Sequence, residues 1–255
     1  MRKFIDAWLQ KIRDVTEGHG FVCDYCGAEV FEYPEKRLCE DCENSLRRIG
    51  ERVCEKCGRE TRAAGICLDC KAKVRAFAKG FAPFVYRGET ASLVNRMKNG
   101  KPRLARFFGE NMAAHFLENY PETLPNTEEE PLLLLPVPMT REKRRERGYN
   151  QAEKLTLAVL HELQKRGIAA YTDFEVLEKK RDTTAQKQMN SREREESVQG
   201  AYHVHKRKEC RGKTVVLIDD ILTTGTTSGE CAERLLGAGA RAVYLLVAAA
   251  LPERE

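Results

Sequence analysis

The sequence has no long apolar run. Crossing a bilayer takes about 20 predominantly apolar residues, and no such stretch occurs in this chain of 255 residues, which argues against a membrane-spanning protein. The N-terminal segment also lacks the uninterrupted apolar core of a signal peptide, because Asp6, Lys11 and Arg13 divide it. Without an export signal we expect a cytoplasmic protein, and in a reducing compartment cysteines rarely build a disulfide framework.

Aromatic residues are also few, at 7%, but 42% of the residues are hydrophobic and 33% are charged. This composition supports a sizeable core and excludes general disorder. The length suits a small domain joined to a core domain of about 150–180 residues. Within residues 1–20 the pattern predicts a short amphipathic helix that packs on its own protein, with membrane contact as the alternative; its apolar face comprises Phe4, Ile5, Trp8, Leu9 and Ile12.

Cysteine, by contrast, is abundant in one region. Two Cys-x-x-Cys pairs can place four thiolates around one tetrahedral zinc ion, and a glycine after the leading pair of each half suits a tight turn that directs N–H groups at the sulfurs. Residues 21–72 therefore predict a double zinc ribbon with two structural Zn²⁺ ions. Its eight cysteines form the pairs Cys23/Cys26, Cys39/Cys42, Cys54/Cys57 and Cys67/Cys70.

The leading pairs of the two halves are 31 residues apart, which indicates a tandem repeat. We expect consecutive pairs to share an ion; a cross-braced arrangement stays open, as do redox-active dithiols and free core thiols. Four thiolates leave no open coordination position, so these sites are structural rather than catalytic. The net charge of −3 over residues 21–70 argues against the ribbons as the main nucleic-acid-binding surface. Cys210 and Cys231 receive no role.

The composition changes after Cys70, since residues 71–106 contain ten basic residues and one acidic residue. Interleaved aromatic residues would make such a segment suitable for single-stranded DNA, with Arg96, Lys98, Lys101 and Arg103 as possible DNA contacts. The alternative is that the aromatic residues belong to a half-buried strand and the charges solvate a surface. The aromatic residues are Phe77, Phe81, Phe84 and Tyr86, and a further basic group is Lys206, Arg207 and Lys208.

From residue 73 to 255 apolar strand patterns alternate with helical ones, which predicts an α/β domain with a parallel, doubly wound sheet and helices on both faces. The polar segment 178–199 has no packing periodicity and suits a mobile lid. The predicted strands are 80–86, 132–137, 174–177, 201–204, 214–218 and 242–250, and the predicted helices are 90–99, 104–120, 150–166 and 227–237.

The run VVLIDDILTTGTTSGE, from Val215 to Glu230, is the most specific motif. Hydroxyls and N–H groups at a helix N-terminus can hold a phosphate, and adjacent carboxylates can accept two ribose hydroxyls or bind Mg²⁺. No Gly-Lys-Ser/Thr follows, so this is not a Walker loop. The alternative is an ordinary capped helix after a strand. The residues concerned are Asp219, Asp220, Thr223, Thr224, Gly225, Thr226 and Thr227.

This run resembles the phosphoribosyl-pyrophosphate motif of type I phosphoribosyltransferases. Together with the cysteine module and the phrase LLPVPMTREKRRERGYNQAEKL (residues 134–155), it resembles the ComF/GntX family over nearly the whole chain. That family joins a zinc-binding module to a phosphoribosyltransferase-like domain and is associated with DNA uptake. The resemblance implies that Asp219 and Asp220 bind the ribose hydroxyls, that residues 223–227 hold the 5′-phosphate, and that Mg²⁺ accompanies phosphoribosyl pyrophosphate.

The resemblance also implies a pyrophosphate side of the site. The turn from Pro138 through Met139 to Arg141 would approach the pyrophosphate, with Arg147 and Asn150 closing over it. Asp219, Asp220 and Arg147 are then the catalytic candidates. Residues 143–145 are expected to form a solvated basic face. Tyr149 stands where many members have Phe, a difference for which we expect no chemical consequence.

Two functions follow from the resemblance. The first is binding of phosphoribosyl pyrophosphate, or a related phosphorylated ribose, by a protein that handles single-stranded DNA during DNA uptake, with other DNA-uptake proteins as partners. The alternative is an active, Mg²⁺-dependent phosphoribosyltransferase of nucleotide metabolism or salvage with no DNA role. No hood element that would choose an acceptor is recognisable, and with five residues after Ala250 we expect no C-terminal hood. Turnover is therefore left open.

Overall fold

The computed structural model describes residues 22–32, 36–119, 127–179 and 200–253. The predicted helix within residues 1–20 and all but the first two residues of the predicted lid lie outside this part of the chain. The chain divides into two compact units, residues 1–46 and 47–255, which we describe separately. The domain limits predicted from the sequence stay predictions. Among the described helices, none is long and apolar enough to cross a membrane.

The smaller unit is a single cysteine-bearing ribbon. Val22 and Glu29 form an antiparallel bridge around a turn, in which Gly27 adopts a φ of 81° that favours glycine. The short helix α2 (Glu40–Asn44) follows, with Cys39 at its N-cap.

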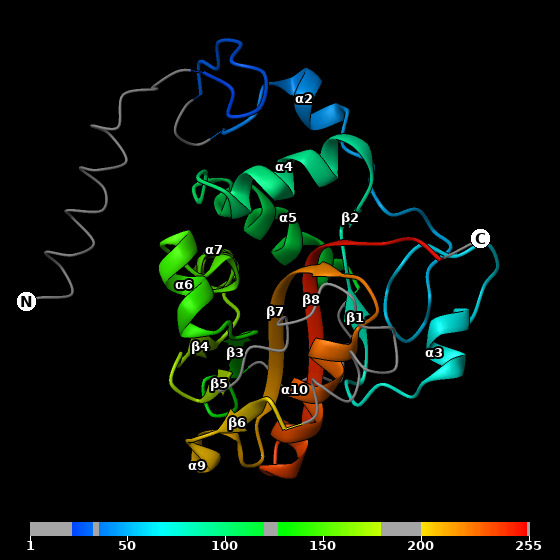
Figure 1. Ribbon diagram of the computed structural model, residues 1–255, viewed down its shortest axis with the longest axis vertical. Helices are drawn as coiled ribbons and strands as arrows, with labels where there is room; N and C mark the ends of the chain where they lie inside the picture. Colours follow the sequence, from blue (N-terminus) through cyan, green and yellow to red (C-terminus); the bar gives the residue numbers. More distant parts are fainter. Residues whose placement is uncertain (1–21, 33–35, 120–126, 180–199, 254–255) are drawn as a thin grey trace, which may run out of the picture. The chain divides into compact units, whose positions relative to one another are not determined.

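The larger unit is built on a parallel sheet (Figure 1). Its strands run in the order β1-β8-β7-β3-β4, and β2 also pairs with β8. Every pair in this sheet is parallel, which confirms the predicted doubly wound architecture. The strands are β1 (Gly80–Phe81), β2 (Phe84–Val85), β3 (Leu132–Pro136), β4 (Ala170–Thr172), β7 (Thr214–Leu222) and β8 (Ala242–Ala250). A separate antiparallel pair joins β5 (Leu177–Lys179) to β6 (Tyr202–Val204).

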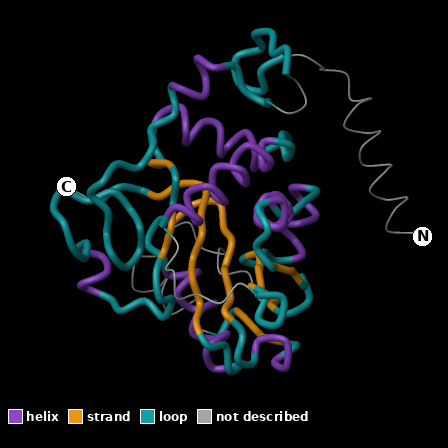
Figure 2. The backbone as a smooth tube through the Cα atoms, turned by 180° about the vertical axis from the view of Figure 1, so that it is seen from behind, coloured by secondary structure: helices purple, strands orange, loops and turns teal. Residues whose placement is uncertain are grey.

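The helices of the larger unit cover the sheet. Helices α5 and α7 pack on each other and against strands β8 and β3, and α10 packs against β6 and β8 (Figures 1 and 2). The helices are α3 (Leu68–Ala72), α4 (Gly88–Lys98), α5 (Leu104–Glu118), α6 (Arg141–Arg147), α7 (Gln151–Lys165), α9 (Arg207–Cys210) and α10 (Thr226–Gly237).

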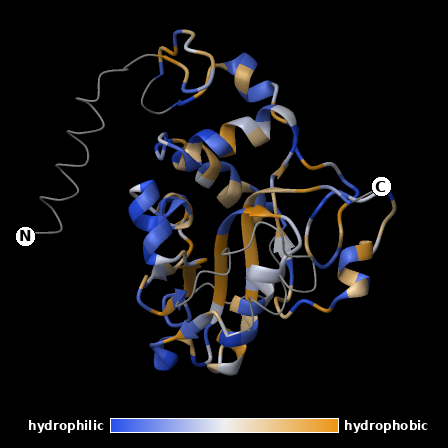
Figure 3. Ribbon diagram, in the orientation of Figure 1, coloured by the Kyte–Doolittle hydropathy of each residue, from blue (hydrophilic) through white to orange (hydrophobic). Residues whose placement is uncertain are grey.

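The central strands are apolar over most of their length, as the hydropathy colouring of β7 and β8 shows (Figure 3), with Asp219 and Asp220 as the charged residues of β7. Alternate strand residues, such as Leu217 and Leu245, share one core with Leu235 of α10 because successive side chains point to opposite faces of a sheet. Burying both faces explains why these strands read as continuous hydrophobic runs rather than as alternating ones.

The aromatic residues of the basic segment belong to the core. Phe77, Phe81 and Phe84 are buried, and the Phe81 ring meets the Phe116 ring edge-on with centroids 5.1 Å apart. The core interpretation is therefore confirmed for these three rings, and they are not available as stacking platforms for bases. Tyr86 is half-buried.

Two strand predictions are wrong. The single strand expected over residues 80–86 is two strands of two residues, β1 and β2, separated at Pro83, which has no N–H to donate to a ladder. Of the strand expected over 174–177, residues 174–176 form a turn after β4, and only Leu177 is in a strand, as the first residue of β5. Asp173 starts that turn, because its carboxylate accepts a hydrogen bond from the Glu175 N–H at 2.9 Å.

Helix α6 was not predicted; it begins at Arg141, where the expected turn of residues 138–141 ends. It has no buried residue, so it has no apolar periodicity by which a sequence pattern would reveal it. Its local signals are at the ends: the Thr140 side chain accepts from the Lys143 N–H, and Gly148 ends the helix with a φ of 78°.

Candidate functional site

The candidate loop connects β7 to α10. Gly225 is the N-cap of α10 and adopts a φ of 73°, which a residue with a side chain rarely tolerates. The loop surrounds a hollow of about 60 Å³. The hollow is lined by Asp219, Ile221, Leu222, Thr223, Thr224, Gly225, Thr226, Thr227 and Ser228. The structure thus brings together every predicted residue of this motif except Asp220.

The N-terminus of α10 is open to an anion. Glycine at the N-cap supplies no side-chain acceptor, and the first turn contains no acidic residue. The first N–H groups of a helix lack intrahelical partners and lie at the positive end of the helix dipole. The Thr224 and Thr226 hydroxyls lie 3.0 Å apart beside them, and the Thr224 hydroxyl accepts a long hydrogen bond from the Thr226 N–H at 3.4 Å. N–H groups, hydroxyls and a positive dipole end together suit a phosphate group.

Two carboxylates, Asp219 and Asp220, lie near the end of β7. Asp220 is 5% exposed and Asp219 is half-buried. The Asp219 carboxylate accepts a hydrogen bond from the Asp220 N–H at 2.8 Å. Burial raises the pKa of Asp219, and the neighbouring Asp220 charge raises it further, while Lys98 and Lys179 act in the opposite direction.

Lys98, which we predicted as a DNA contact, lies beside the carboxylate pair instead. Lys98 is the last residue of α4, and its Nζ lies 3.2 Å from Oδ2 of Asp220. The contact is an ion pair rather than an aligned hydrogen bond, because this buried Oδ2 has no hydrogen-bond partner in the described structure. Lys98 was predicted as a DNA contact only because it lies in the basic segment; its pairing with Asp220, 122 positions later in the chain, left no local signal.

The predicted pyrophosphate residues lie near the end of β3. Strands β3 and β7 are parallel neighbours, with Pro136 opposite Ile218, so the segment after β3 and the loop after β7 meet at one edge of the sheet. Pro138, Met139, Arg141 and Asn150 line a separate cavity of about 410 Å³. The Arg141 guanidinium donates to Glu178 at 3.3 Å.

Asn150 and Arg147 also have contacts within the protein. The Asn150 side chain is buried and caps α7 by accepting from the Ala152 N–H at 3.0 Å. Arg147, at the end of α6, donates to the side-chain oxygen of Gln151 at 3.3 Å. Their predicted contact with pyrophosphate stays a prediction.

Tyr149 has a chemical consequence, contrary to expectation. Its hydroxyl donates to the Met97 carbonyl and accepts from the Gly100 N–H at 3.1 Å. A Phe at this position would lose both bonds. The phenol thus fixes the end of α4, from which Lys98 reaches Asp220, to the segment between α6 and α7.

The remaining predicted DNA contacts lie around the turn between α4 and α5. Arg96 is exposed, and Lys101 and Arg103 are half-buried. The Lys101 N–H donates to the Arg96 carbonyl at 3.0 Å, which holds the turn compact. The three cations therefore lie on the same turn that Tyr149 holds through Met97 and Gly100.

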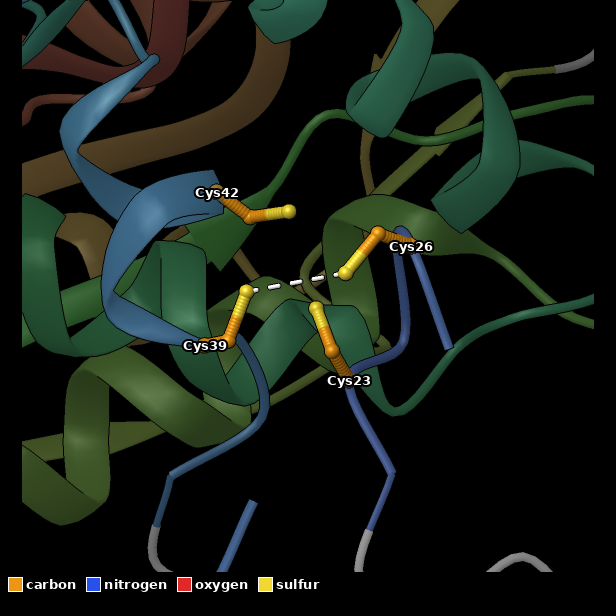
Figure 4. Close-up of side chains that lie close together, drawn as sticks. All are labelled: Cys23, Cys26, Cys39 and Cys42. Carbon is orange, nitrogen blue, oxygen red and sulfur yellow. Dashed lines mark hydrogen bonds between the residues drawn. The ribbon is translucent and has the colours of Figure 1, made fainter. Parts of the chain in front are cut away.

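The cysteines form two separate tetrads, each made of consecutive pairs. In each tetrad the four sulfurs lie within 4.8 Å of one another, which confirms consecutive pairing over the cross-braced arrangement. Figure 4 shows the first tetrad, in which the Cys26 and Cys39 sulfurs are 3.6 Å apart. The tetrads are Cys23, Cys26, Cys39 and Cys42, and Cys54, Cys57, Cys67 and Cys70.

The donor set fits zinc. Four converging thiolates match a closed tetrahedral site, and backbone N–H groups already point at the sulfurs, from Ala28 to Cys26 at 3.4 Å and from Cys67 to Cys54 at 3.3 Å. The tetrads differ in burial: all four cysteines of the second are buried, whereas Cys26 of the first is exposed. Two structural zinc sites follow from these tetrads.

Comparison with known proteins gives matches to both parts of the chain. Residues 19–71 match the double zinc ribbon domain family, and residues 159–255 match the phosphoribosyl transferase domain family. Competence protein ComFC of Bacillus subtilis (strain 168) is 24% identical over 87% of this chain and 91% of its own length. ComFC of Streptococcus pneumoniae (strain R6) is 28% identical, covering 81% and 84%.

Two further matches are partial. The DNA utilization protein YhgH of Escherichia coli (strain K12) is 29% identical over 44% of this chain and 46% of its own length. Among solved structures, a hypoxanthine-guanine phosphoribosyl transferase of L. donovani is 14% identical, with a TM-score of 0.38 and coverage of 56% of this chain and 66% of that one.

The parallel sheet, the loop at the start of α10 and the two cysteine tetrads define a class of protein: a double zinc ribbon joined to a domain with the type I phosphoribosyltransferase fold. The similarity to two ComFC proteins over most of the chain makes the comparison more specific. Together with the two domain matches it supports the ComF-like family as the one that this chain resembles.

Proposed function

We propose that this protein binds phosphoribosyl pyrophosphate, or a related phosphorylated ribose, at the loop between β7 and α10 and handles single-stranded DNA during DNA uptake. The observation that carries the ligand proposal is the open N-terminus of α10 next to the carboxylate pair of Asp219 and Asp220. The names of the relatives, competence protein and DNA utilization protein, support the DNA role.

Different residues of the site would hold different groups of the ligand. The N–H groups of residues 224–227 and the threonine hydroxyls would hold the 5′-phosphate. The Oδ2 of Asp220, which has an ion pair with Lys98 but no hydrogen bond, would accept a ribose hydroxyl. Lys98 holds the Asp220 charge in place for that bond.

The oxygen donors of Asp219 and Asp220 also suit Mg²⁺, which would offset the charge of the pyrophosphate. The turn at 138–141 and Arg147 are proposed for the pyrophosphate side. If transfer occurs, a nucleophile forms a bond to C1′ while the C1′–O bond to pyrophosphate breaks, and the protein supplies positioning and charge neutralisation.

The proposed DNA surface is the turn between α4 and α5, with Arg96, Lys101 and Arg103. With Phe77, Phe81 and Phe84 in the core, the proposal depends on phosphate contacts, so affinity for single-stranded DNA should fall steeply with salt. Removing three phosphate contacts should reduce the slope of log affinity against log salt by about 2.

An alternative function is a Mg²⁺-dependent phosphoribosyltransferase of nucleotide salvage without a DNA role. The specific observation in its favour is that the loop and its carboxylate pair are both complete. The two functions differ in whether DNA binds to the α4–α5 turn at all.

The test is calorimetric titration of the zinc-loaded protein with phosphoribosyl pyrophosphate and Mg²⁺. We expect saturable binding that is lost in the double variant Asp219→Asn with Asp220→Asn, while single-stranded DNA binding persists. Absence of saturable binding by the folded wild type would refute the ligand proposal.

The DNA role is tested by reversing Arg96, Lys101 and Arg103 to Glu. The matched control reverses three exposed cations elsewhere, Lys36, Arg52 and Arg166. Equal loss of DNA affinity in both triple variants would show that only net charge matters and would refute the placement on the α4–α5 turn.

A further inference from the structure

The second ribbon is built into the core of the larger unit. The four cysteines Cys54, Cys57, Cys67 and Cys70 belong to the same buried cluster as the central strands. The Gly80 N–H at the start of β1 donates to the Lys56 carbonyl at 2.8 Å. A Cβ on Gly58 would lie 2.3 Å from the Gly80 carbonyl oxygen, so only glycine allows these two segments of the backbone to lie this close together.

A buried arginine connects this ribbon to the phosphate loop. Arg59 is 2% exposed, and its guanidinium has three separate partners. Nε donates to the Cys57 sulfur at 3.3 Å, and one terminal nitrogen donates to the Asp69 carboxylate at 2.6 Å. The other terminal nitrogen donates to the carbonyl of Thr223 at 2.6 Å. The planar fork of arginine can hold three such partners at fixed angles, which lysine cannot.

The bond to Thr223 fixes the orientation of a peptide in the phosphate loop. In a planar trans peptide, the carbonyl and the following N–H point in opposite directions. Holding the Thr223 carbonyl toward the ribbon therefore directs the Thr224 N–H away from it. A second buried arginine, Arg75, supports the same loop: a Cβ on Gly225 would lie 3.5 Å from its Nε.

The first ribbon shows that a ribbon of this type does not need the arginine. Aligning the repeats on Cys-Gly places Ala28, after Cys26 and Gly27, at the position of Arg59, after Cys57 and Gly58. The first tetrad still assembles with Ala28 there. Arg59 is therefore explained by the loop that it contacts rather than by the zinc site alone.

We propose that Arg59 is a positioning residue that ties the phosphate loop to the second zinc site, so that the loop keeps its anion-binding conformation only while that site is intact. The part of this inference that concerns ligand affinity rests on the proposed function. The part that concerns loop conformation does not, because it is measured without a ligand.

The experiment compares Arg59→Ala with the matched control Arg47→Ala, which removes an arginine that pairs with Glu60 at the surface of the same ribbon. Zinc content, hydrogen exchange of peptides covering residues 221–229 and titration with phosphoribosyl pyrophosphate are measured on the full chain. For Arg59→Ala we expect two zinc ions, loop exchange at least about tenfold faster and affinity at least about tenfold weaker, with strands β7 and β8 unchanged. Arg47→Ala should behave as the wild type.

Wild-type loop exchange in an Arg59→Ala variant that holds both zinc ions would overturn the proposal. If Arg59→Ala binds only one zinc, Arg59→Lys decides: with both ions bound, its loop should exchange faster than the wild type, and wild-type exchange would overturn the proposal. Faster loop exchange in a protein whose wild type does not bind phosphoribosyl pyrophosphate would support the positioning role of Arg59 and refute the proposed ligand instead.

Discussion

Replacing Lys98 with Met should destabilise the fold, because it removes the nearest cation from two adjacent carboxylates. The Lys98 Nζ lies 3.2 Å from Asp220 Oδ2, and the two side chains are 18% and 7% exposed. At an effective dielectric constant of about 20, two unit charges at this separation attract by about 5 kcal/mol. Desolvation of both groups offsets much of this attraction, so we expect a net coupling of about 1–3 kcal/mol.

The assay is a double-mutant cycle in urea at pH 8, with zinc bound. Lys98→Met should lower the free energy of unfolding by about 2 kcal/mol, because it leaves Asp220 buried without a counter-charge. Asp220→Asn should cost less, since the lysine can extend into solvent. The double variant Lys98→Met with Asp220→Asn should regain most of the loss. Additive effects within about 0.3–0.5 kcal/mol would refute the coupling and with it the assignment of Lys98 to the site.

Two further predictions concern neighbouring groups. Because burial raises the pKa of Asp219, the folded protein keeps a proton that the unfolded chain loses, so this residue reduces stability as pH rises from its usual pKa to the raised one. Asp219→Asn should therefore stabilise the protein, by roughly 1.4 kcal/mol for each tenfold difference in proton affinity between the folded and unfolded chains. The gain in melting temperature should grow between pH 4 and pH 8. A gain that does not vary with pH would contradict this prediction. Tyr149→Phe should lower the free energy of unfolding by about 1 kcal/mol, because it loses the hydrogen bonds to Met97 and Gly100. The control Tyr86→Phe, which removes a 3.3 Å bond to an exposed Asn95, should lower it less. Equal losses in urea unfolding would refute the anchoring role of Tyr149.

The elements with strong apolar patterns were predictable from the sequence. Strands β3 and β8 and helices α7 and α10 end within about two residues of their predicted limits, which is the usual accuracy for helix boundaries. Strand β7 runs four residues beyond its predicted end at Ile218, through both carboxylates, because Ile221 and Leu222 pair with the end of β8. That pairing is a tertiary contact which no local pattern contains.

The site was predictable where its chemistry is contiguous in the sequence. The run from Asp219 to Thr227 contains both the carboxylates and the hydroxyls, so its residue types alone predict the proposed site. The contacts of Lys98, Tyr149 and Arg59 were not predictable, because each joins segments far apart in the chain; Arg59 and Thr223 are 164 positions apart. Such contacts depend on the packing of the ribbon and α4 against the sheet.

The unequal burial of the two tetrads has a consequence for metal exchange. Cys26 is exposed and Cys39 half-exposed, whereas the second tetrad is buried throughout. Chelators and oxidants attack accessible thiolates first, so the two ions should leave at different rates. A preparation with one zinc per chain would then be a uniform population that has lost the first ion, rather than a mixture of fully loaded and empty molecules.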